Sequence, residues 1–125
     1  MKIRVYYEDT DAGGIVYHTN YIKYCERARS EIFFKEGLMP FDKNGSGFVV
    51  RSLEADFLGT AKLGDTLEVK TETLESKRAS TLLRQSIFLE GKIIFDMRVL
   101  LVYLVDGRVK KIPEELLNLI KQNRV

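Results

Sequence analysis

The segment from Asp9 to Tyr21 concentrates residue types that can do chemistry. It contains two carboxylates, Asp9 and Asp11, a pair of glycines, and the only histidine of the chain, His18. A carboxylate can act as a nucleophile or as a general base. Glycines permit a tight turn, and the start of a helix offers backbone N–H groups that can bind a developing negative charge. We therefore interpret this segment as a catalytic loop that leads into a helix.

The composition of the chain is typical of one small globular domain. Its 125 residues are 45% hydrophobic, and 20 lysines and arginines against 18 aspartates and glutamates give a formal net charge of +2. The basic residues are scattered, which does not favour nucleic-acid binding. The single cysteine, Cys25, cannot form an internal disulfide, and one histidine does not make a zinc cluster. We expect one domain over residues 1–125, in the cytoplasm, without a metal, a signal peptide or a membrane-spanning segment.

Hydrophobic periodicity predicts the elements that position this loop. Alternation over residues 3–7 indicates a first strand that ends at residue 8 or 9, and helical spacing indicates a long amphipathic helix over residues 20–35. Thr19 or Asn20 would cap that helix. Further strands are predicted at residues 48–57, 66–74, 81–89 and 93–105, and a short helix from residue 113. This order indicates an α+β fold in which an antiparallel meander packs on the long helix.

The last long strand is apolar on more than one face. Every second residue from Ile93 to Val105 is apolar, so we expect the long helix to cover that face. The other face begins with charged residues and ends with Leu100, Val102 and Leu104. Contact with another subunit would explain this pattern, and a second covering segment of the same chain would explain it equally well.

Residues 4–21 read RVYYEDTDAGGIVYHTNY, and Tyr24 and the run Glu26–Arg29 follow on the predicted helix. This pattern resembles the hotdog-fold acyl-CoA thioesterases, within them the 4-hydroxybenzoyl-CoA thioesterase branch, and specifically the Tol-Pal-associated, YbgC-like family. The resemblance implies a hotdog fold, in which a curved antiparallel sheet wraps a long central helix. It also implies hydrolysis of acyl-CoA to the free acid and CoA. Coenzyme A is then part of the substrate and product, and no other cofactor is expected.

The resemblance assigns the catalytic carboxylate to Asp11, which could attack the thioester or activate a water. It makes the backbone N–H of His18 the expected main oxyanion donor, while the imidazole could orient substrate or water. Gly13 and Gly14 would let the thioester approach the main chain. Asp9 is expected to support the turn. The structural alternative for Asp11 is an acid that only closes an Asx-turn or caps the helix.

Three other side chains are rivals for the catalytic role. Glu26 and Glu31 lie on the predicted helix, where a different branch of hotdog thioesterases places its catalytic acid. The neighbouring arginines instead favour surface or interface pairing for both. Cys25 lies mid-helix on the apolar stripe, which favours a place in the core.

Substrate contacts outside the loop follow from charge and from the resemblance. Lys77, Arg78 and Ser80 share one turn and are candidates for binding the CoA phosphates. Tyr17, Tyr21 and Phe57 are candidates for the acyl pocket. The resemblance implies a homodimer or homotetramer whose active sites are shared between subunits. A non-hydrolytic module that binds acyl-CoA or acyl carrier protein remains the alternative function, because a fold can keep an old site.

Overall fold

The computed structural model describes residues 1–123 of the chain. Its elements in chain order are β1 (Lys2–Arg4), the 3-10 turn η1 (Tyr7–Asp9), α1 (His18–Phe34), β2 (Gly47–Phe57), β3 (Thr66–Ser76), β4 (Ser80–Leu89), β5 (Lys92–Val105), β6 (Arg108–Val109) and α2 (Glu114–Lys121). One long helix is followed by long antiparallel strands and a short helix. The α+β fold predicted from the sequence is therefore confirmed.

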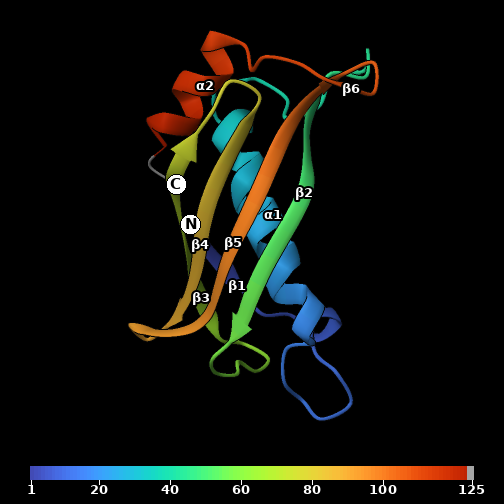
Figure 1. Cartoon of the computed structure of the whole chain (residues 1–125). Coiled ribbons are helices and arrows are strands. Elements are labelled where there is room, and N and C mark those ends of the chain that lie inside the picture. The colour runs from blue at the N-terminus through green and yellow to red at the C-terminus, as the bar shows by residue number, and fades with distance from the viewer. Residues whose placement is uncertain (124–125) are drawn as a thin grey trace.

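The strands form one antiparallel sheet in the order β1-β3-β4-β5-β2, and β6 pairs with the end of β5. Figure 1 shows α1 lying along one face of this curved sheet, with α2 at the end where β3 turns into β4. The 11-residue strand β2 forms one edge and pairs with β5. Among residues 1–123 no further strand pairs with β2, so this edge is open.

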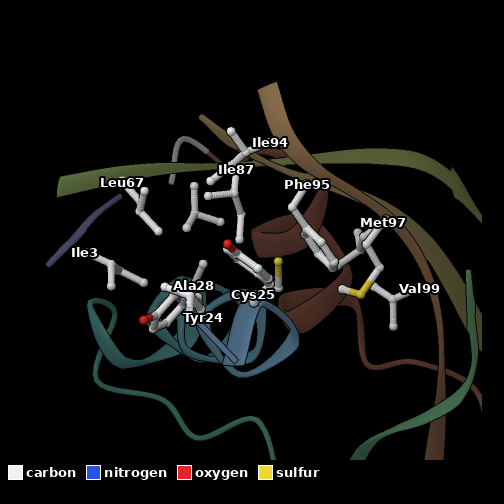
Figure 2. Packing of buried hydrophobic residues seen from close by; sticks show 14 of the residues in the cluster. Ile3, Tyr24, Cys25, Ala28, Leu67, Ile87, Ile94, Phe95, Met97 and Val99 are labelled. Carbon is white, nitrogen blue, oxygen red and sulfur yellow. The ribbon is translucent and has the colours of Figure 1, made fainter. Parts of the chain in front are cut away.

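The core lies between α1 and the inner face of the sheet. One stripe of the helix, which includes Tyr24, Cys25 and Ala28, is buried at helical spacing. Figure 2 shows this stripe facing side chains that the sheet supplies, among them Leu67, Ile87, Ile94, Phe95, Met97 and Val99. Burial of this apolar surface holds the helix against the sheet. The position of the helix N-terminus relative to the sheet is set in the same way.

One polar side chain lies inside this core with its hydrogen bonds satisfied. Gln85 is fully buried, and its Nε2 donates to the carbonyl oxygen of Cys25 at 2.8 Å and to Oγ1 of Thr71 at 3.0 Å. Its Oε1 accepts from Nη1 of Arg29 at 2.9 Å. Burial lowers the pKa of Arg29 from its ordinary value. Because buried polar groups must be paired, these bonds tie β4 to one position along α1.

Three predictions about the elements were wrong in detail. β1 ends at Arg4, because the chain turns into η1 at Tyr7, where the Asp9 carboxylate accepts the Tyr6 N–H. Helix α1 begins at His18, so Thr19 and Asn20 lie in its first turn and cap nothing. In β5 the pairing with β4 shifts by one residue near Ile94, which buries Ile94 beside Phe95 and breaks the predicted alternation.

Among residues 1–123 no helix is both long and apolar enough to cross a membrane.

Candidate active site

The loop between η1 and α1 is a closed turn. The Asp11 N–H donates to the Ile15 carbonyl oxygen at 2.9 Å, and the Gly14 N–H donates to the Asp11 carbonyl oxygen at 3.0 Å. Gly14 has a φ of +84°, in the left-handed region that favours glycine. The Val16 N–H donates to the Ala61 carbonyl oxygen at 2.8 Å, which anchors the loop to the segment before β3.

Asp11 is exposed at the tip of this loop. Its Oδ1 accepts the Gly13 N–H at 2.8 Å, so Asp11 does close an Asx-turn. Oδ2 accepts no hydrogen bond from any residue in the described part of the chain. The carboxylate borders a hollow of about 410 Å³ whose walls include Tyr7 and Leu63. Asp11 is thus oriented by one oxygen and open to a ligand through the other.

The start of α1 offers backbone donors to the same region. The Asn20 N–H is taken by the Tyr17 carbonyl oxygen at 2.8 Å, and the Tyr17 N–H by the Asp9 carbonyl oxygen at 2.9 Å. The N–H groups of His18 and Thr19 have no partner within residues 1–123. They lie at the positive end of a 17-residue helix, where an anionic oxygen is favoured.

Aromatic rings line the junction between the start of α1 and the end of β2. The His18 ring lies 4.6 Å from the Tyr17 ring, centroid to centroid, and meets Phe57 edge-on at 5.9 Å. His18 is exposed, and Tyr17 and Phe57 are each about half exposed. These three rings form an aromatic surface at the start of α1, where the His18 and Thr19 N–H groups have no partner among residues 1–123. Phe57 was considered for the acyl pocket together with Tyr17 and Tyr21. It lies beside His18, and its contact with substrate stays a prediction.

Tyr21 is instead part of the core, with 3% of its surface exposed. Its ring stacks on Phe95 at 5.5 Å, and its hydroxyl oxygen accepts the Ala61 N–H at 3.1 Å. Burial raises its pKa above the ordinary value for a tyrosine. In this chain Tyr21 holds the segment that anchors the loop, and contact between Tyr21 and substrate stays a prediction.

Lys77, Arg78 and Ser80 lie in and beside the turn between β3 and β4, far from Asp11. The loop between η1 and α1 contacts the chain just before β3. The β3–β4 turn follows the other end of this 11-residue strand, so roughly 35 Å of strand separates the two. Figure 1 shows the two regions at opposite ends of the sheet. Lys77 and Ser80 border a separate hollow of about 420 Å³. The structure does not bring these residues together with Asp11 within one chain.

The rival catalytic residues are further along α1. Glu26 and Glu31 are exposed, and Glu26 accepts a hydrogen bond from Oγ of Ser30 at 2.9 Å. Both lie at least seven residues beyond the free N–H groups at the helix start. Cys25 is fully buried, and burial raises the pKa of its thiol to about 12. The thiol is therefore protonated at neutral pH and is a poor nucleophile.

Asn20 was missed as a site residue because the sequence favoured a capping role. Its Nδ2 donates to Oδ1 of Asp9 at 2.9 Å, and both side chains are buried. The signal was present, since Asn20 is the polar member of a helical stripe that continues with Tyr21, Tyr24 and Cys25. An unpaired amide at such a position is costly, which indicates a partner.

The fold and this loop–helix junction define a hotdog-type α+β domain with an acid beside the start of its long helix. A family model described as the thioesterase superfamily matches residues 13–94. The chain belongs to this superfamily.

The chain is similar to the acyl-CoA thioesterase YbgC of Helicobacter pylori, with 52% identity over 88 residues that cover 70% of this chain and 65% of that protein. It is 38% identical over 123 residues to the acyl-CoA thioesterase YbgC of Haemophilus influenzae, covering 92% and 88% of the two chains. Among solved structures it is similar to a hypothetical protein from Aquifex aeolicus, with a TM-score of 0.90, 26% identity, and coverage of 97% and 98%.

Proposed function

We propose that this protein is an acyl-CoA thioesterase, which hydrolyses the thioester of acyl-CoA to the free acid and CoA. The observation that carries the proposal is that an exposed carboxylate, Asp11, lies on the loop that leads into α1, where the N–H groups of His18 and Thr19 have no partner among residues 1–123. Membership of the thioesterase superfamily and the names of the relatives support it. The buried, single cysteine fits a reducing cytoplasm.

The chemistry needs an acid and donors for a developing oxyanion. Asp11 either attacks the thioester carbon to form a mixed anhydride or takes a proton from the water that attacks it. In both cases the carbonyl oxygen gains negative charge that the His18 and Thr19 N–H groups stabilise. The C–S bond then breaks, and the CoA thiolate leaves. On the anhydride route a water subsequently releases the acid and restores the carboxylate.

Binding of the CoA phosphates calls for cations that the loop lacks. Between Arg4 and Lys23 the chain contains neither lysine nor arginine. Lys77 and Arg78 supply such charge, and a homodimer through the open edge of β2 would bring them to the partner's site. Lys77, Arg78 and Ser80 of one chain would then bind the CoA phosphates at the site of the partner.

The geometry of such a dimer follows from the register. If two copies of β2 pair antiparallel about Ser52, Phe57 of one lies opposite Gly47 of the other. Phe57 contacts His18, whereas the Gly47 end of β2 lies at the end of the sheet that carries the β3–β4 turn. The turn of one chain would therefore approach the catalytic loop of its partner. Two such dimers could pair further into a tetramer.

Thiol release from short, medium, long and aromatic acyl-CoAs tests the function in wild type and in Asp11→Asn. We expect the variant to fold normally and to lose at least about 100-fold in kcat, because an amide neither attacks the thioester nor accepts the proton. Asp42→Asn is the matched control, since Asp42 is also an exposed acid that accepts backbone N–H groups in a turn.

Full activity in Asp11→Asn would transfer the role to Glu26, Glu31 or His18. Binding of acyl-CoA or acyl carrier protein by a wild type that hydrolyses none of the panel would instead establish the non-hydrolytic alternative.

A further inference from the structure

We infer that Asp9 and Asn20 form a buried clamp that sets the position of Asp11 relative to the N–H donors of α1, and that both are positioning residues for hydrolysis. This inference rests on the proposed function of Asp11. The clamp is defined as the two side chains and the hydrogen bond between them, 2.9 Å from Nδ2 of Asn20 to Oδ1 of Asp9.

Asp9 joins three separate parts of the site. Its Oδ1 accepts from Asn20 in the first turn of α1, and its Oδ2 accepts the Tyr6 N–H at 2.9 Å. Its backbone carbonyl oxygen accepts the Tyr17 N–H at 2.9 Å. Only 3% of Asp9 is exposed, so water does not replace these bonds when one of them is lost.

The carboxylate of Asp9 is also unusual because, within the described part of the chain, it is buried without a cation beside it. Burying a carboxylate is costly, yet no cation among residues 1–123 forms an ion pair with it, and the groups that donate to it are neutral. The buried hydroxyl of Tyr24, one turn beyond Asn20, has no hydrogen-bond partner of ordinary geometry among the same residues. Burial and the nearby Asp9 raise the pKa of Tyr24. The Asp9 carboxylate is therefore held in place by the hydrogen bonds that it accepts from the Tyr6 N–H and from Nδ2 of Asn20.

The clamp acts on both halves of the site because of where its residues lie in the chain. Asp9 is two residues before Asp11, and Asn20 is two residues after His18. A bond that holds positions 9 and 20 together therefore also holds Asp11 at a set distance from the oxyanion donors at the start of α1. A misplacement of about 1 Å between reacting groups can lower the rate about 100-fold. The clamp contacts no reacting atom, so its effect is on kcat through geometry.

Suppression of one substitution by another tests the clamp. Asn20→Asp places two carboxylates face to face, and we expect kcat to fall about 10- to 100-fold while KM changes less than about threefold. Adding Asp9→Asn to that variant restores a donor–acceptor pair of reversed polarity, since the amide now at position 9 can donate to the carboxylate now at position 20 and still accept the Tyr6 N–H. The double variant should recover kcat to within about threefold of wild type. Asp42→Asn serves again as the control and should leave kcat unchanged.

Measurement well below the melting temperature separates positioning from stability, because a purely structural role would lower Tm and leave kcat of the folded enzyme unchanged. Amide hydrogen exchange of residues 9–20 provides a readout that needs no activity. We expect faster exchange at Tyr17 in Asn20→Asp and its return to the wild-type rate in the double variant. Wild-type kcat and exchange in Asn20→Asp, or a double variant no better than the single one, would overturn the clamp. An inactive wild type would overturn the proposed function. In that case the amide hydrogen exchange at Tyr17 would still show whether the clamp holds the loop.

Discussion

At the scale of single residues, Asp11 closes an Asx-turn and still leaves one carboxylate oxygen for the catalytic role proposed above. One oxygen closes the turn on the Gly13 N–H, and the other is free of hydrogen bonds from the described residues. The turn therefore aims the carboxylate without consuming it. Rotamer freedom of an exposed acid would otherwise have to be lost when substrate binds.

The two glycines of the loop should respond differently to alanine. A β-carbon at Gly13 would lie 3.2 Å from Oδ1 of Asp11, whereas one at Gly14 would meet no atom within 4 Å but would adopt a φ of +84°. Gly13→Ala should displace the carboxylate and lower kcat about 3- to 10-fold with little loss of stability. Gly14→Ala should lower the free energy of unfolding by about 1 kcal/mol.

Urea unfolding and steady-state kinetics of both variants check this pair. Wild-type kcat in Gly13→Ala would contradict the view that the Asx-turn aims the acid, since the crowded oxygen would then not matter.

At the scale of elements, part of the outer face of the sheet carries paired charged side chains, whereas the inner face is packed with apolar side chains. Asp96 on β5 is paired across strands with Asp56 on β2, which brings like charges together. Arg84 on β4 offsets this, because its Nε and Nη2 donate to the two carboxylate oxygens of Asp96 at 2.9 and 3.1 Å. Ser86 adds a third bond at 3.1 Å.

This pairing predicts a specific dependence of stability on pH. The hydrogen bonds from Arg84 lower the pKa of Asp96 below its ordinary value. A lowered carboxyl pKa contributes stability above the unfolded-state pKa of about 4, and that stability is lost as the pH falls through the folded-state value. Asp96→Asn should thus lower Tm at pH 7, by at most about 4 °C because the pair is partly exposed.

Thermal unfolding of wild type and Asp96→Asn from pH 7 to pH 2.5 checks this expectation. The two Tm values should converge as the pH falls below about 4. A constant difference over the whole range would mean that the charge of Asp96 is not what stabilises the sheet.

The sequence predicted those elements whose signal is local. The long helix follows from the spacing of Tyr21, Tyr24, Cys25 and Ala28, and the loop before it from the adjacent glycines Gly13 and Gly14. The shift in pairing near Ile94 could not be predicted, because it depends on contacts between β4 and β5. The helical stripe indicates that Asn20 needs a buried partner, but the identity of that partner, Asp9, depends on how the loop folds back over eleven residues and so was missed.

At the scale of the whole molecule, the central feature is the length of the sheet that separates Asp11 from the turn containing Lys77 and Arg78. Within one chain these groups lie at opposite ends of β3. In the dimer through β2 proposed above, each chain would contribute the acid to one site and the cations to the other. Sedimentation of the wild type should accordingly give a mass of two or four chains.

If each site takes residues from both chains, two defective variants should complement each other when they form a mixed dimer. A chain with Asp11→Asn keeps an intact turn, and a chain with Lys77→Ala and Arg78→Ala keeps an intact acid. When the two are unfolded and refolded together, half of the dimers should be hybrids, and each hybrid has one complete site. At low substrate concentration the mixture should recover about a quarter of the wild-type activity, which is more than either parent shows alone. Hybrids that form but stay inactive would mean that each chain binds and hydrolyses its substrate by itself.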